Sequence, residues 1–382
     1  MQILIAGDFS DNNRVSDSIR KGDYKNLVDN VKPIINQFDY SIVNFEFPII
    51  TSSGKPILKY GPNLCGQQKS IDVIKYAGFN VCTLANNHIL DQGGDCCIET
   101  KNMLEEAGIK TVGVGKNISE AGEILYLKSN DEIVAIINCC ENEFSVAGDK
   151  SPGANPLNPI RQFYKIQEAK ALADYVVVIV HGGHEFFQLP SLRMVETYRF
   201  FVDAGADAII NHHQHCYSGY EIYHSKPIFY GLGNFLFDSA LKRKTSWNEG
   251  FMLGLTLDEG CIDFSLFPYY QCKDTPTITL MNEQDKMSFF ESIEHLNKII
   301  SNDKILRSEL TKYYLSEEND VLKVFEPYSG RFFSKLYEMG LVPKFCRKYK
   351  KNALLNFIQC ESHRDKVIGI LKQNYDTDKK RT

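Results

Sequence analysis

Five short apolar runs in the first 215 residues each end on polar residues of the kinds that bind metals. The runs contain aliphatic and aromatic residues without polar alternation, a pattern that predicts strands buried on both faces of a parallel sheet. In such sheets ligands bind beyond the carboxyl ends of the strands, so the pattern predicts a site where these ends meet. With their polar ends, the runs span residues 3–8, 41–46, 81–88, 176–181 and 208–215.

Segments with helical spacing of apolar residues separate the runs, and this βαβ alternation predicts an α/β fold. The composition of residues 129–131 is typical of a turn, which predicts that the strands on either side of it are antiparallel. Glu259-Gly260 predicts a second hairpin turn. Helices are expected over residues 67–77, 95–107, 160–173 and 189–204. Further strands are expected over residues 111–114, 123–127, 132–139, 226–237, 250–257 and 261–270.

The character of the chain changes after about residue 275, where charged amphipathic helices are expected over residues 287–300, 304–314 and 351–372. No cluster of metal-binding residue types is apparent in this part of the sequence. The pattern therefore predicts two parts, a domain over residues 1–272 and a mainly helical extension over residues 273–382.

Composition narrows the classes of function. The net charge of −5 over 382 residues gives no whole-chain signal for nucleic acid. No stretch approaches the ~20 apolar residues of a membrane-spanning helix, and the first residues do not resemble a signal peptide. The eleven cysteines lack the paired spacing of a zinc ribbon, so they are interpreted as reduced core residues without chemistry. A cytoplasmic location is expected.

The residues at the strand ends have the chemistry of a site for two divalent ions. Such a pair needs a bridging carboxylate, and Glu46 is the natural bridge, while Asn87 offers a neutral carbonyl oxygen. Nitrogen and oxygen ligands suit Mn, Fe or Zn. Two ions about 3.5–4 Å apart activate water and hold both the attacking and the leaving oxygen. Asp8, Asn44, His181, His213 and His215 complete the set, and the last two are spaced to share one face of a strand.

His88 follows Asn87 in a turn that leaves the strand, so its ring is expected to face the open side of the site. There it can stabilise developing charge or protonate a leaving oxygen. His184 and Glu185 are expected to contact substrate or to orient His181, although a satisfied loop pair would look alike. His212 is interpreted equally as a residue that supports the ligands or as a packing residue. The histidines at 224, 295 and 363 are interpreted as structural.

At these residues the sequence resembles the CapA-type capsule-synthesis proteins. These poly-γ-glutamate biosynthesis proteins form a branch of the calcineurin-like metallophosphoesterases. The resemblance covers about residues 1–270 and also includes a segment similar to YSLGNF at residues 230–238. Its other motif blocks are residues 6–8, 44–46, 85–88, 155–157, 181–185 and 212–215.

The resemblance implies a calcineurin-like β-sandwich flanked by helices and carrying two metal ions. It implies one ion held by Asp8, Glu46 and His215, a second held by Glu46, Asn87, His181 and His213, and His88 as the catalytic histidine. The first block lacks the histidine found in general metallophosphoesterases, and Glu46 replaces their bridging Asp, which leaves the first ion with fewer ligands. Substrate or supporting roles are expected for Asn44, Asn86, Asn155, His184, Glu185 and His212.

Together these expectations favour a two-metal hydrolase that takes part in capsule or extracellular-polymer biosynthesis. Its substrate would be an anionic or phosphorylated small molecule or polymer precursor. One alternative is a non-catalytic, metal-dependent accessory subunit of a polymer synthase, and another is hydrolysis of amide or γ-glutamyl bonds at the same site. A basic, aromatic segment at residues 331–351 is interpreted as a solvated helix face, or as a contact with an anionic lipid surface or an anionic polymer. A contact with lipid would place the protein at the inner face of the membrane, beside a membrane synthase complex.

Overall fold

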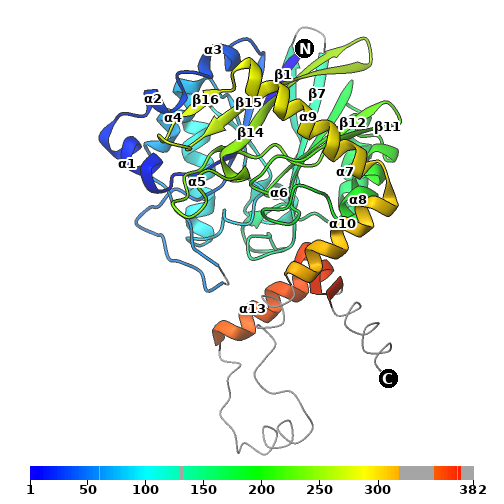
Figure 1. The fold of residues 1–382 in the computed structure, drawn as a ribbon. Helices are drawn as coiled ribbons and strands as arrows, with labels where there is room; N and C mark the ends of the chain where they lie inside the picture. Colours follow the sequence, from blue (N-terminus) through cyan, green and yellow to red (C-terminus); the bar gives the residue numbers. More distant parts are fainter. Residues whose placement is uncertain (60, 130–131, 318–347, 368, 371–382) are drawn as a thin grey trace, which may run out of the picture.

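Two β-sheets form the centre of the protein in the computed structural model, which describes residues 1–59, 61–129, 132–317, 348–367 and 369–370 (Figure 1). In the first sheet the order is β16 (Ile278–Leu280), β15 (Cys261–Gln271), β14 (Glu249–Asp258), β1 (Gln2–Phe9), β2 (Tyr40–Phe45), β3 (Val81–Thr83) and β4 (Lys110–Val112), and β13 (Asn234–Leu236) also pairs with β1. In the second sheet the order is β11 (Tyr220–Tyr223), β12 (Lys226–Phe229), β10 (Ala208–His212), β9 (Tyr175–His181), β7 (Glu132–Cys140) and β6 (Leu125–Ser129). A two-stranded sheet joins β5 (Val114–Gly115) to β8 (Gly153–Ala154).

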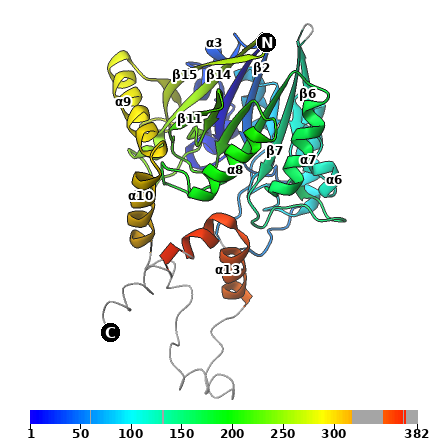
Figure 2. The ribbon, with the colours of Figure 1, turned by 90° about the vertical axis from the view of Figure 1, so that its right-hand side faces the viewer.

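Helices cover the outer faces of the two sheets, which gives the expected α/β sandwich (Figures 1 and 2). The helices beside the first sheet are α1 (Asn13–Lys21), α2 (Lys25–Val28), α3 (Lys32–Ile35), α4 (Ser70–Ala77) and α5 (Gly94–Glu106). Those beside the second sheet include α7 (Pro159–Lys170) and α8 (Leu192–Asp203), and the short α6 (Ile118–Ala121) follows β5. The later helices are α9 (Glu283–Ile300), α10 (Asp303–Ser316) and α13 (Lys348–Gln359).

The first strand shows why these apolar runs form central strands. Ile3 and Ile5 of β1 pack in the core that also contains the residues of β9 and β10. Leu4 and Ala6, which point the other way, pack in a second core with residues of α1 and α4. Both faces of the strand are therefore buried, as its unbroken apolar sequence predicts.

Parallel pairing brings the polar strand ends to one edge of each sheet. Asp8 of β1 pairs with Asn44 of β2, and Asn44 in turn pairs with Thr83 of β3. In the second sheet His181 of β9 pairs with His212 of β10. A register shift in β1 between Ala6 and Asp8 lets Asp8 lie level with Asn44. The predicted convergence of the strand ends is thus present in the backbone pairing alone.

Both predicted antiparallel strand pairs are confirmed, but the predicted single strand over residues 226–237 is wrong. It divides into β12 in the second sheet and β13 in the first. The chain crosses between the sheets at Gly233, whose φ of +79° is left-handed. A Cβ atom there would meet the carbonyl oxygen of Glu249 at 2.6 Å, so a turn and a close approach both require glycine.

The helices after residue 280 pack on the sandwich. Phe289, Ile293 and Leu296 of α9 lie in the same core as the strands of the second sheet, and α9 contacts β11. Strand β16 extends the first sheet beyond residue 272, and the division expected there stays a prediction. None of the helices within the described residues combines the length and apolar character needed to cross a membrane.

Helix α13 and the helical residues after it lie below the sandwich, beyond the end of α10 (Figures 1 and 2). The predicted helix over residues 351–372 is interrupted at Cys360, which separates α13 from the helical residues 361–367. The basic segment at residues 331–351 lies outside the described residues as far as residue 347.

Replacing Gly7 by alanine tests how tightly β1 and β13 must approach. The added Cβ would lie 1.8 Å from the carbonyl oxygen of Gly233, so the strands must separate. We expect Gly7→Ala to lower the free energy of unfolding by about 3 kcal/mol or more. The control is Gly122→Ala, where the new Cβ has no contact closer than 3.4 Å and a change within about 1 kcal/mol is expected. Urea unfolding measures both, and equal stabilities of the two variants would contradict the packing described.

Candidate metal centre

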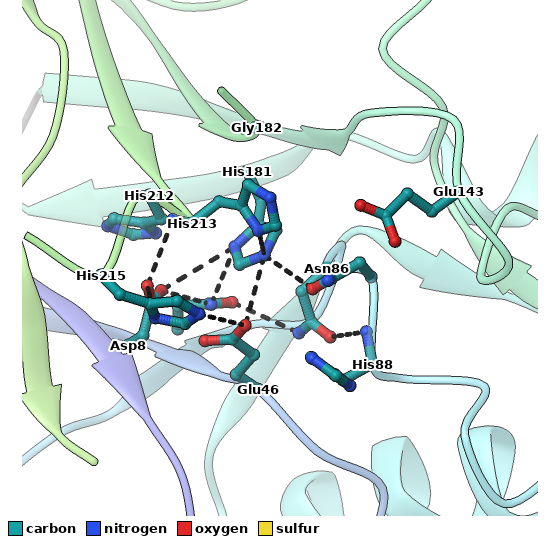
Figure 3. A network of polar contacts seen from close by, with 12 residues as sticks. Asp8, Glu46, Asn86, His88, Glu143, His181, Gly182, His212, His213 and His215 are labelled. Atoms are coloured by element: carbon teal, nitrogen blue, oxygen red, sulfur yellow. Dashed lines mark hydrogen bonds and ion pairs between the residues drawn. The ribbon is translucent and has the colours of Figure 1, made fainter. Parts of the chain in front are cut away.

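Six of the side chains expected to bind metal lie together at the strand ends of the two sheets; Figure 3 labels five of them, and Asn87 lies against His181. Asp8 lies on β1, Glu46 directly follows β2, and Asn87 lies in the loop after β3. The other three come from the second sheet, at the end of β9 and just after β10. None is more than 6% exposed. The set comprises Asp8, Glu46, Asn87, His181, His213 and His215.

The six side chains divide into two ligand groups that share Glu46. Asp8, Glu46 and His215 form one group, with His215 Nδ1 at 3.6 Å from Asp8 Oδ2 and His215 Nε2 at 3.9 Å from Glu46 Oε1. Glu46, His181 and His213 form the other, in which His181 Nε2 lies 3.5 Å from Glu46 Oε1. Asn87 Oδ1 lies 3.0 Å from the same His181 nitrogen.

Glu46 provides the test of whether divalent cations fit this cluster. Its side chain is fully buried, and neither carboxylate oxygen has a hydrogen-bond partner among the described residues. Burial raises the pKa of Glu46, although the nearby His215 opposes this shift. A buried carboxylate without partners costs several kcal/mol unless a cation compensates it. The unmatched oxygens, placed between two sets of nitrogen and oxygen ligands, fit a pair of bridged ions.

Two of the three histidines in the cluster, His181 and His213, are held in the neutral form that binds metals. Burial lowers the pKa of His181 to about 4 and lowers the pKa of His213 well below its usual value. Burial also opposes the charged form of His215, but Glu46 and Asp8 outweigh it and raise the pKa of His215. At neutral pH His181 and His213 are therefore neutral and can offer a lone pair.

The backbone at His213 and His215 differs from the expected strand geometry. Strand β10 ends at His212, and the two following ligands have φ values of 91° and 56°. Their rings therefore reach the cluster from left-handed turn residues and not from one face of a strand, which corrects the sequence-based expectation. Such conformations cost about 1–3 kcal/mol each and are typical of functional sites.

Asn44 and Asn86 form a buried layer behind the ligands. Asn44 Nδ2 donates to Asp8 Oδ1 at 2.7 Å and lies 3.2 Å from His181 Nδ1. Asn86 donates to the backbone oxygen of Phe45 and accepts a hydrogen bond from the backbone N–H of His88. These contacts fix the positions of the groups that face the cluster.

The remaining predicted residues lie at different places. His212 is buried beside Asp8, and neither ring nitrogen has a hydrogen-bond partner among the described residues. Asn155 is not one of the residues around the pocket: it donates to the backbone oxygen of Asn138 and accepts from Gln162. The structure therefore gives Asn155 a role in holding the loop that precedes α7.

Lys59 and Asp91 are neighbours of His88 that the sequence analysis missed. The Asp91 carboxylate accepts the backbone N–H of Leu64, forms an ion pair with Lys59, and lies 2.6 Å from His88 Nδ1. An N–H at Nδ1 that donates to Asp91 leaves Nε2 as the ring atom available to a substrate. The spacing of Asp91, three residues after His88, could have indicated this pair, whereas nothing in the sequence links Lys59 to it.

A pocket of about 590 Å³ opens over the cluster and is partly enclosed by the C-terminal helices. Asn87, His88 and His215 line it from the metal side, together with Glu185. Its aromatic side contains Phe186 and Trp247, and the Trp247 ring lies 4.7 Å from the His215 ring. The residues that the C-terminal helices contribute to the wall are Tyr313, Glu317, Asn356, His363 and Lys366.

His184 also lines this pocket, and it lies under the end of α10. Its ring is 5.3 Å from the Tyr313 ring, and Tyr313 stacks on Phe187 at 4.0 Å. Burial lowers the pKa of His184 well below its usual value, and its nitrogens have no partner in the described part of the chain. His184 thus contacts the aromatic residues of the extension and not His181.

The fold and site define a two-sheet α/β protein with a buried cluster of metal-ligand residues at the strand ends. The family model for the bacterial capsule synthesis protein PGA_cap matches residues 2–239, and the chain belongs to this family. This confirms the resemblance that the motif blocks indicated.

Individual relatives agree with the family match. The chain is 32% identical over 251 residues to a capsule biosynthesis protein CapA of Bacillus anthracis, covering 64% of this chain and 61% of that protein. It is 34% identical over 216 residues to a PGA biosynthesis protein CapA of Bacillus subtilis, covering 56% and 57%. The match therefore spans about 60% of the length of these relatives. Among solved structures, a phosphatase from Mycoplasma pneumoniae matches 72% of this chain and 95% of its own, with 15% identity and a TM-score of 0.46.

The buried His184 gives a prediction for the metal-free protein. In the unfolded chain a histidine binds its proton near pH 6.5, but the folded protein keeps His184 neutral well below that pH. Stability attributable to His184 is therefore complete above about pH 6.5 and is lost as the pH falls, by up to about 1.4 kcal/mol per pH unit. We expect His184→Phe, which retains an aromatic ring, to reduce the fall in Tm between pH 7 and pH 5 relative to the wild type.

The comparison with wild type removes the contributions of other titrating groups, including Glu46, whose raised pKa acts in the opposite direction. His224→Phe is the matched control, because the side chain of His224 is 68% exposed. Thermal melts after chelator treatment give the slopes. An unchanged slope for His184→Phe would show that His184 is not held neutral.

Proposed function

We propose that the chain is a two-metal hydrolase acting on phosphoester bonds in capsule or extracellular-polymer biosynthesis. The observation that carries the proposal is the position of Glu46, which belongs to both ligand groups and has two buried oxygens without hydrogen-bond partners among the described residues. A shared carboxylate is the feature that a dinuclear site requires. The nitrogen and oxygen donors favour Mn, Fe or Zn.

When bound, the ions would polarise the phosphoryl oxygens and lower the pKa of a water between them. His88 faces the pocket from the side of Asn87, where it can donate a proton to the leaving oxygen. Asp91 holds His88 through Nδ1, and Lys59 balances the charge of Asp91 inside the protein. Asn44 and Asn86 keep Asp8, His181 and the turn at His88 in place.

The pocket accepts a substrate of limited size, and divalent cations at the cluster would attract an anionic one. Lys366 reaches the pocket wall from the C-terminal helices, where its ammonium lies 3.5 Å from Glu317 Oε2. Aromatic rings at Phe186 and Trp247 offer an apolar surface on the opposite side. These features fit a phosphorylated precursor or a polymer end. The expected cytoplasmic location, peripheral to the inner face of the membrane, stays a prediction, as does association with a synthase complex.

Metal content tests the bridging role of Glu46. We expect Glu46→Gln, purified without chelator, to contain two ions fewer than the wild type, or to hold one of those two only weakly, because the amide cannot bridge two cations. Elemental analysis gives the number and identity of the ions in both proteins. The control is Glu249→Gln, since Glu249 lies on β14 and is absent from both ligand groups. The same number of tightly bound ions in Glu46→Gln as in the wild type would exclude the bridge.

Activity tests the role of His88. With Mn²⁺ and bis-p-nitrophenyl phosphate or p-nitrophenyl phosphate, we expect His88→Ala to lower kcat by about 10²- to 10⁴-fold. Asp91→Asn, which weakens the contact that orients His88 and also the ion pair with Lys59, is expected to lower kcat by about 10- to 100-fold with KM little changed. Asn87→Ala is expected to lose turnover through weaker metal binding. His224→Ala, at an exposed position, is the control.

Two other outcomes would replace the proposal. Metal binding without turnover of any phosphoester, amide or γ-glutamyl compound would favour a metal-dependent accessory protein of a polymer synthase. Turnover of amide or γ-glutamyl compounds alone would assign the site to hydrolysis of those bonds.

A further inference from the structure

A second group of metal-ligand side chains lies where the C-terminal helices meet the sandwich. Glu143 comes from the loop after β7, whereas Cys360 and His363 follow α13. One ligand atom from each of the three lies within 4.8 Å of the others. The sequence analysis gave none of these residues a role in metal binding, since more than two hundred positions separate Glu143 from the other two.

The distances in this group leave room for a cation between Cys360 and Glu143. Cys360 Sγ lies 3.8 Å from Glu143 Oε1 and 3.9 Å from Glu141 Oε2, both weak contacts of a thiol, and 3.3 Å from Ser362 Oγ. Two ligands bound tetrahedrally to zinc, at about 2.0 and 2.3 Å, lie roughly 3.5 Å apart. Cys360 and Glu143 therefore need only a small adjustment to hold one ion between them.

Unmatched polar atoms provide a second and independent observation. His363 Nδ1 is buried and has no hydrogen-bond partner among the described residues. Asn356, one helical turn before Cys360, is 3% exposed, and its side-chain oxygen likewise has no partner in the described part of the chain. Both residues line the pocket. Buried polar atoms without partners are costly, so their accumulation at one place indicates a missing ligand.

The arrangement around this group holds its members in position. Arg193 pairs with both Glu141 of the β7 loop and Asp365 of the C-terminal helical residues. Glu361 accepts the backbone N–H of Asn142 at 3.0 Å. The two segments that supply the ligands are therefore already joined by contacts that do not involve the ligands themselves.

We propose that Glu143, Cys360 and His363 bind a third metal ion beside the pair held at Glu46, with Glu143 also accepting a hydrogen bond from Asn87. A thiolate, an imidazole and a carboxylate form a ligand set of the zinc type, whereas the pair at Glu46 has only nitrogen and oxygen ligands. Three protein ligands leave a fourth position for water. Because Glu143 and His363 both line the pocket, the ion fastens the C-terminal helices to the pocket wall next to the proposed catalytic centre.

Cobalt substitution tests this site separately from the pair at Glu46. Co²⁺ bound to a thiolate gives an intense charge-transfer band in the near ultraviolet, which nitrogen and oxygen ligands alone do not give. In the full chain reconstituted with Co²⁺, we expect three bound ions and this band. Glu46→Gln is expected to retain one ion and the full band, because its remaining site is the one at Cys360.

Variants of the proposed ligands complete the test. Cys360→Ser and His363→Gln should each bind one ion fewer than the wild type, and Cys360→Ser should lose the band. Cys261→Ser is the matched control, because Cys261 is exposed and its replacement should change neither quantity. Circular dichroism establishes that the variants are folded. If a ligand variant fails to fold, the result for Glu46→Gln decides the question alone.

The two proposals fail in different ways. Two ions in the wild type, none in Glu46→Gln and no thiolate band would overturn the third site and leave the proposed function intact. If the wild type binds a single ion, and Glu46→Gln retains that ion and its thiolate band, the third site is supported and the two-metal hydrolase is overturned.

Discussion

The Glu46 carboxylate sets the main physical constraint on this structure. It is fully buried at the junction of the two sheets, and no described residue donates a hydrogen bond to it. A group of this kind is destabilised unless it takes up a proton or has positive charge beside it. Burial keeps His181 and His213 in the neutral form at physiological pH, whereas Glu46 and Asp8 raise the pKa of His215. The cluster fits the pair of cations in the proposed function, and the surrounding fold holds the six side chains close together.

The architecture explains how so many ligands converge without help from one continuous motif. Parallel pairing places Asp8 and Asn44 level in one sheet, and His181 and His212 level in the other. The sandwich then brings the two edges together. Left-handed residues at His213 and His215 turn the chain back into the gap, at a cost in backbone strain that packing elsewhere must offset. The close contact between Gly7 and Gly233 belongs to the same region, so tight packing and ligand geometry depend on each other.

The sequence predicted the central strands and the six clustered side chains because both follow from local patterns. Apolar runs determine which strands are buried on both faces, and polar residues at their ends lie where parallel strands place them. The left-handed turn at His213 was not predictable, since histidine spacing alone suggested one face of a strand. Lys59 was missed because its loop carries no periodic signal, and its contact with Asp91 arises only in the folded chain. The division of residues 226–237 between two sheets also depends on tertiary packing around Gly233.

The C-terminal helices change the interpretation of the site most, because their sequence shows only charge and helical periodicity. In the folded protein they contribute His363 and Lys366 to the pocket wall, and Tyr313 covers His184. An open cluster at the strand ends of a sandwich could accept a long polymer from many directions. Under the proposed function, a pocket of about 590 Å³ with one wall formed by these helices would favour smaller groups or chain ends. Substrate selection would then depend on how firmly this wall is attached. Direct ion pairs through Arg193 are one attachment, and each loses strength wherever water reaches it. An ion bound by ligands from both sides would hold the wall more strongly, because metal–ligand bonds are shorter and more directional than ion pairs.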